Sequence, residues 1–143
     1  MTEAALVDAF VAEVSAGESP WTGLPLGREF EYQRGRADIV TAMIDGTVIA
    51  FEAKLTRWRD ALQQAYRNRC FAHRSYVLLP VRAARIAHKF VPEFQRRGVG
   101  LCYVGDDGVV ILLESPSTQP IQPWLSSRAA AHAAKGMNAE SDS

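Results

Sequence analysis

Hydrophobic and polar residues follow helical spacing in some segments of this chain and strand-like alternation in others. Near the start, apolar residues recur every three or four positions, which predicts an amphipathic helix with Thr2 as its N-cap and Gly17 as its end. After a loop rich in Gly and Pro, the alternation of residues 29–32 predicts a first strand. Residues 39–44 and 47–51 then form two β-rich runs separated by an Asp-Gly pair, which is typical of a tight type I′ hairpin turn.

The following part of the chain alternates between the two patterns. Helical spacing covers residues 57–73 and 82–97, and strand-like runs cover residues 76–79, 99–104 and 109–113. Pro92 would break or kink the second of these helices. The order α-β-β-β-α-β, followed by α-β-β, predicts an α/β fold in which a mixed β-sheet is flanked by helices.

The length and composition fit one domain with a real core. The chain has 143 residues, 48% of them hydrophobic, which leaves no room for two domains. We expect this domain to span residues 1–114. From Ser115 the composition changes to Ser, Pro, Gln and Ala, so we expect residues 115–143 to be a partly disordered extension, with a short helix over residues 128–135 and disorder from residue 136.

Cysteine usage and hydropathy bear on the cellular compartment that we expect for this protein. Cys70 and Cys102 have no metal-ligand spacing, so we interpret them as reduced core thiols. No apolar run approaches the roughly 18 residues that span a bilayer. We therefore expect a cytoplasmic protein with no membrane partner.

Three charged residues around the first hairpin suggest chemistry. Asp38 precedes its first strand, and Glu52-Ala53-Lys54 ends its second. The hairpin brings Asp38 and Glu52 together, and Glu52 and Lys54 share a face because side chains at i and i+2 point the same way. Two carboxylates can hold Mg²⁺, with the Ala53 carbonyl as a third ligand, and Lys54 can orient water or stabilise the transition state of phosphodiester cleavage. The alternative is an exposed hairpin whose charges only solvate one face.

With the helix and strand that follow, residues 36–80 resemble the PD-(D/E)XK nuclease superfamily, which has the restriction-endonuclease-like fold. The chain has Ala37 where that pattern often has Pro. The resemblance implies an αβββαβ core and an Mg²⁺-dependent nuclease, with Mn²⁺ as a substitute ion, acting most often on DNA. Many members carry a Gln on the helix after the E-x-K strand. Gln64 is the candidate here rather than Gln63, because Ala61, Gln64 and Asn68 form a row that faces the site beside the buried stripe of Trp58, Leu62 and Ala65.

Charge is uneven along the chain although the total is zero. Residues 52–97 contain eleven basic and three acidic residues, a net charge of +8. A basic surface beside the carboxylates suits a phosphate backbone, whereas each arginine taken alone could be an ordinary solvated one. The predicted nucleic-acid contacts are Arg57, Arg59, Arg67 and Asn68.

Two other function classes stay open. One is a catalytically inactive nucleic-acid-binding module, and the other is a protein-interaction module with a nuclease-like fold. The short chain also leaves open a homodimer or a subunit of a larger nucleic-acid-processing or defence assembly. Intact Asp38, Glu52 and Lys54 favour the enzyme, because unused carboxylates beside a nucleic acid would repel its phosphates.

Overall fold

The computed structural model describes residues 1–141, and the side chains of residues 1–136. The helices are α1 (Glu3–Ala16), α2 (Trp58–Asn68), α3 (Val81–His88), α4 (Val91–Arg97) and α5 (Pro123–Ser141), and the strands are β1 (Leu26–Tyr32), β2 (Gly35–Ala42), β3 (Val48–Ala53), β4 (Arg74–Leu79), β5 (Gly100–Gly105) and β6 (Gly108–Leu113). The αβββαβ order and the mixed α/β fold class predicted from the sequence are confirmed.

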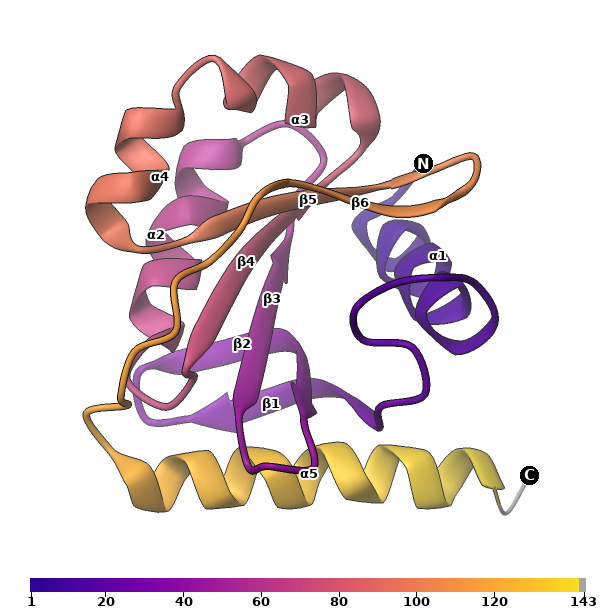
Figure 1. Cartoon of the computed structure of the whole chain (residues 1–143), viewed down its shortest axis with the longest axis vertical. Helices are drawn as coiled ribbons and strands as arrows, with labels where there is room; N and C mark the ends of the chain where they lie inside the picture. Colours follow the sequence, from indigo (N-terminus) through magenta and orange to yellow (C-terminus); the bar gives the residue numbers. More distant parts are fainter. Residues whose placement is uncertain (142–143) are drawn as a thin grey trace.

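The six strands form one sheet in sequence order, β1 to β6. β3, β4 and β5 run parallel, while the outer pairs are antiparallel. Parallel neighbours need a crossover connection, which α2 provides between β3 and β4, and the α3–α4 pair between β4 and β5 (Figure 1). The two crossover connections place the carboxyl ends of β3 and β4 at one edge of the sheet.

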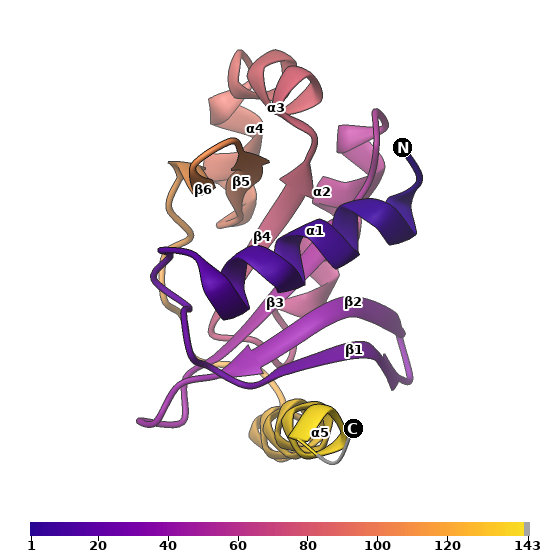
Figure 2. The same ribbon diagram turned by 90° about the vertical axis from the view of Figure 1, so that its right-hand side faces the viewer.

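Helices cover the two faces of the sheet unequally. α1 crosses one face (Figure 2), where Phe10, Trp21, Phe51 and Tyr76 form a buried aromatic cluster. The other face packs against α2, α3 and α4 through mostly small and aliphatic side chains. Thr2 caps α1 as predicted, since its hydroxyl oxygen accepts a hydrogen bond from the Ala5 backbone N–H at 3.0 Å. None of the helices in residues 1–141 is both long and apolar enough to cross a membrane.

The hairpin of β2 and β3 differs from its prediction in the turn that joins the two strands. A type I′ turn needs positive φ at both central residues, but only Gly46 of the Asp-Gly pair has it, at 91°. The chain instead forms a three-residue loop. In this loop Met43 N–H donates to the Thr47 carbonyl at 2.8 Å, and Gly46 N–H donates to the Met43 carbonyl at 3.0 Å. The strands and their antiparallel pairing are as predicted.

Two helices, α2 and α3, end at positions that the sequence pattern placed inside a helix. α2 stops at Asn68 rather than near His73, and the chain continues in tighter turns, in which the N–H groups of residues 69–71 bond to the carbonyls three residues earlier. The segment predicted as one helix over residues 82–97 is two, α3 and α4, separated at Lys89-Phe90. Pro92 lies in the first turn of α4, where its missing N–H costs nothing.

Helix α5 packs on β1 and β2, as Figure 2 shows end-on. Leu125, Ala129 and Ala133 are buried there against Phe30 and Phe71. The helix is much longer than the predicted residues 128–135 and continues through positions 136–141, for which the sequence suggested disorder. The last two predicted disordered positions, 142 and 143, lie outside the described residues.

Candidate active site

Asp38 and Glu52 come from neighbouring antiparallel strands. Ile39 pairs with Phe51, so the preceding residue of β2 lies opposite the following residue of β3. Asp38 Oδ2 accepts a hydrogen bond from the Ala53 backbone N–H at 2.8 Å. Strand pairing and this bond therefore bring the two carboxylates to one place, at the carboxyl end of β3.

Both carboxylates line a cavity of about 540 Å³. Its lining consists of Glu3, Glu31, Tyr32, Gly35, Arg36, Asp38, Glu52, Lys54, Gln64 and Arg67. The predicted quartet of Asp38, Glu52, Lys54 and Gln64 is thus gathered around one space, although it comes from β2, β3, the residue after β3, and α2. The arrangement excludes the alternative in which the hairpin is a freely solvated surface, because Glu52 is only 1% exposed.

Glu52 is held by a chain of hydrogen bonds. The Asn68 side-chain amide donates to Glu52 Oε1 at 2.8 Å, and the Tyr32 hydroxyl donates to Asn68 Oδ1 at 2.6 Å. Because the tyrosine occupies the amide oxygen, the amide nitrogen is directed at the carboxylate. Tyr32 and Asn68 therefore fix the orientation of the Glu52 carboxylate.

Ionisation of Glu52 beside Asp38 is unfavourable at this buried position. Burial, and then the nearby Asp38 carboxylate, raise the pKa of Glu52 to about 9, while the Asn68 hydrogen bond and the Arg67 charge act in the opposite direction. Burial also raises the pKa of the Tyr32 hydroxyl to about 12. A carboxylate that is buried beside another carboxylate lacks positive charge, which a bound cation would supply.

The donor set fits a hard divalent cation. Within residues 1–136 no group of three or more His, Cys, Asp and Glu side chains is placed to share a metal ion. Mg²⁺ is usually held by one or two carboxylates, with water and substrate oxygens completing its shell. Asp38 and Glu52 match that pattern. The Ala53 carbonyl stays a predicted ligand, and the amide of the same residue holds Asp38.

Lys54 follows directly after β3, where its backbone N–H donates to the Leu78 carbonyl at 3.2 Å. That bond continues the parallel pairing of β3 with β4 and carries the side chain to the cavity. The Lys54 ammonium lies 3.9 Å from a carboxylate oxygen of Glu3, at the start of α1. Both side chains are partly exposed, so this contact contributes little to stability and leaves the ammonium able to meet a substrate phosphate.

The helical phase predicted for α2 agrees with the structure. Gln64 lines the carboxylate cavity, whereas the exposed Gln63 lines a different one. Arg67 follows Gln64 by three positions and reaches the same cavity. Its guanidinium lies against Gly35, where an added Cβ would come within 2.8 Å of Arg67 Nη2. Glycine at that position therefore makes room for Arg67.

The predicted nucleic-acid contacts are placed differently from one another. Arg57 is paired with Asp60 at 2.8 Å. Arg59 bonds Glu93 through two nitrogens, at 3.1 and 3.3 Å, and lies over the Trp58 ring. Both stay on the surface beside α2.

Asn68 requires a correction, because it is fully buried and both ends of its amide are occupied by Glu52 and Tyr32. It positions a carboxylate and has no surface to offer a nucleic acid. Sequence reasoning also missed Tyr32 and Gly35, which lie before the hairpin and show no spacing relation to the E-x-K segment. For Asn68 the available signal was its position four residues after Gln64 on the same helix, which puts the two side chains on neighbouring turns of one face.

Comparison with known proteins shows a shared fold and indicates no function. No protein-family model matches the chain, and no curated protein matches it. A solved structure, described as the SPO1766 protein of unknown function from Silicibacter pomeroyi, is similar over 99% of this chain and 93% of that chain, with a TM-score of 0.63 and 21% identity. That likeness shows the fold alone.

A second solved structure is SfsA from Pyrococcus furiosus in complex with Ca²⁺. It matches 69% of this chain and 57% of that chain, with a TM-score of 0.38 and 11% identity. This similarity is too low to carry an argument about the site. The function of the carboxylate cavity is therefore inferred from its own residues.

Proposed function

We propose that the protein is an Mg²⁺-dependent nuclease that hydrolyses phosphodiester bonds in nucleic acid, with DNA as the substrate. The observation that carries the proposal is the buried Glu52 carboxylate beside Asp38 in a cavity that also contains Lys54 and Gln64. The resemblance of residues 36–80 to the PD-(D/E)XK pattern supports the same reading, and so does the αβββαβ order of the elements.

The four predicted residues of the cavity each have a role in this reaction. Asp38 and Glu52 would hold the cation, with Asn68 keeping Glu52 in its orientation. A bound Mg²⁺ supplies charge neutralisation at the phosphate and lowers the pKa of water. Lys54 donates to the attacked phosphate, where negative charge grows in the transition state. Gln64 reaches the same space from α2 and orients the attacking water through its side-chain amide.

Substrate binding follows from the charges around the cavity. The segment of net charge +8 includes α2, α3 and α4, which cover one face of the sheet. Of these helices, α2 borders the cavity through Gln64 and Arg67. Phosphates attract such a surface without regard to sequence. A nucleic acid is therefore the polyanion that meets both the basic helices and the carboxylate pair.

Cleavage assays on the purified chain test the proposal. Duplex and single-stranded DNA and RNA are incubated with Mg²⁺ or with EDTA, using the parent, Asp38→Asn, and Asp107→Asn as a control in the exposed β5–β6 turn. We expect the parent and the control to cut only with Mg²⁺, and Asp38→Asn to lose cutting while it keeps its melting temperature. Equal cutting by Asp38→Asn would refute the metal assignment. Binding without cutting by the parent would favour the inactive binding module.

A further inference from the structure

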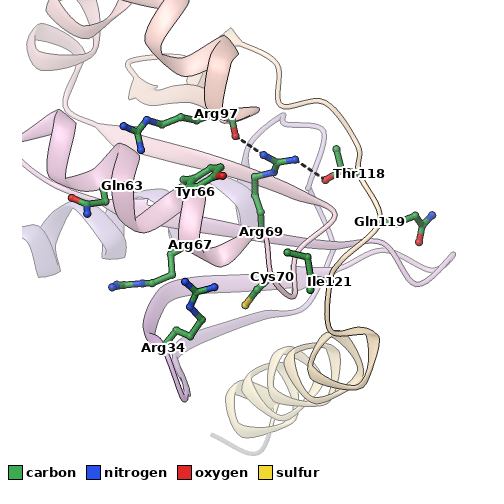
Figure 3. Close-up of a pocket in the computed structure, with 10 residues that line it drawn as sticks. All are labelled: Arg34, Gln63, Tyr66, Arg67, Arg69, Cys70, Arg97, Thr118, Gln119 and Ile121. Carbon is green, nitrogen blue, oxygen red and sulfur yellow. Dashed lines mark hydrogen bonds between the residues drawn. The ribbon is translucent and has the colours of Figure 1, made fainter.

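A second cavity, of about 550 Å³ (Figure 3), shares Arg67 with the carboxylate cavity. Four arginines line it, and they come from separate parts of the chain. Arg34 lies in the connection between β1 and β2, Arg67 in the last turn of α2, Arg69 just after that helix, and Arg97 at the end of α4. Among the described residues that line this cavity, none is acidic.

The positive charge of this arginine pocket is not neutralised by the protein. Within residues 1–136 none of the four guanidinium groups forms an ion pair with a carboxylate. Arg69 donates only to neutral acceptors, the Arg97 carbonyl at 2.7 Å and the Thr118 hydroxyl at 3.4 Å (Figure 3). The Nε of Arg67 is buried and has no hydrogen-bond partner there.

Such a set of like charges repels itself and is stabilised by an anion. A guanidinium presents parallel N–H donors that match a phosphate. A phosphate monoester carries a charge of about −1.5 to −2 near pH 7, against a single charge for each phosphodiester. Four arginines around one cavity therefore suit a terminal phosphate better than a phosphate within a strand.

Arg67 connects the two cavities. It lines both cavities. On the same helix, Gln63 lines the arginine pocket and Gln64 lines the carboxylate cavity. Tyr66 supports the arginine pocket, since the guanidinium carbons of Arg69 and Arg97 each lie 5.7 Å from its ring centroid. A strand whose end occupies the arginine pocket would lie next to the carboxylate cavity, because Arg67 lines both.

We propose that the arginine pocket binds the terminal phosphate of a polynucleotide strand and so directs the protein to phosphorylated strand ends. This assignment rests on the proposed nuclease function for the kind of substrate. It adds a recognition element that the carboxylate site does not contain.

The test measures binding of the full chain to labelled single-stranded oligonucleotides with a 5′-phosphate, a 3′-phosphate or no terminal phosphate, in EDTA. We expect one phosphorylated end to bind about tenfold tighter than the unphosphorylated strand, the effect of one charge-assisted hydrogen bond. Arg34→Gln and Arg97→Gln should each remove the preference. Arg96→Gln, the exposed neighbour outside the pocket, should keep it. The three substituted arginines are exposed, so the variants should retain the parent's melting temperature.

Equal binding of all three oligonucleotides, or a preference that survives in both pocket variants, would overturn the proposal. Competition with inorganic phosphate and with a mononucleotide distinguishes the sources of the phosphate. A mononucleotide that binds as tightly as the phosphorylated strand would make the ligand a free nucleotide and refute recognition of strand ends. Because binding is measured without divalent cation, its outcome is separate from cleavage. Cutting without any preference for an end refutes only the pocket, and end binding without cutting refutes only the nuclease.

Discussion

Replacing Glu52 by Gln should stabilise the metal-free protein above pH 5, and the gain should grow as the pH rises. Gln keeps the shape of the side chain and an oxygen that can accept from Asn68, but it cannot ionise. In the folded parent the pKa of Glu52 is raised to about 9 from an ordinary value of 4.5, by burial and by Asp38. The parent must therefore either keep a proton on Glu52 or bear a buried charge.

The sign and size follow from proton linkage. A folded-state pKa above the unfolded one gives stability that is complete below pH 4.5 and is lost as the pH rises toward 9. One proton corresponds to about 1.4 kcal/mol per pH unit. Parent and Glu52→Gln should be nearly equal in stability at pH 5, and the variant should be ahead by about 3 kcal/mol at pH 7.

Urea unfolding in EDTA across pH 5 to 8.5 measures this difference. Other titrating groups are common to both proteins, so the difference isolates Glu52. Glu18→Gln, which removes an exposed carboxylate, should follow the parent. Adding Mg²⁺ should stabilise the parent and leave Glu52→Gln nearly unchanged, because only the parent keeps both carboxylates. Parallel pH profiles for parent and Glu52→Gln would refute the reasoning.

Three further predictions concern the neighbours of the carboxylates. Lys54→Ala should lower the single-turnover cleavage rate far more than DNA affinity measured in Ca²⁺, since the basic helices maintain binding; lost affinity with an unchanged rate would contradict this. Gln64→Ala should slow cleavage by about 10²-fold, while Gln63→Ala, on the adjacent position of α2, should leave the rate unchanged; the reverse result would place the wrong glutamine at the site. Asn68→Ala should lower stability by about 1–3 kcal/mol in thermal unfolding, because the buried Glu52 loses its donor and the partly buried Tyr32 hydroxyl loses its acceptor, and an unchanged melting temperature would exclude the proposed hydrogen-bond chain.

Sequence pattern predicted the elements that depend on local spacing. The alternation around Asp38 and Glu52 placed them on paired strands, and the apolar stripe of α2 gave the phase that directs Gln64 to the cavity. These features follow from periodicity within one element, which a single sequence displays directly. The position of Pro92 marked the break between α3 and α4 for the same reason.

Features that depend on contacts between distant segments were not predictable. The bond between Tyr32 and Asn68 joins residues 36 positions apart, and no local pattern indicates it. The Asp-Gly pair suggested a two-residue turn, but the pairing of Met43 with Thr47 sets a loop of three. Similarly, the arginine pocket is assembled from four segments: Arg67, Arg69 and Arg97 appear in the sequence only as part of the net excess over residues 52–97, and Arg34 lies outside that segment.

Helix α5 has a consequence for how the protein forms during synthesis. Gly27 and Gly136 lie in close contact there, since a Cβ on Gly136 would come within 2.2 Å of the Leu26 carbonyl. β1 and β2 thus complete their packing against residues near the end of the described chain. Until a ribosome has released residues 125–136, the strand that carries Asp38 lacks its cover and Phe30 has water on one side. The strands β1 and β2 are therefore fully packed only after residues 125–136 have emerged.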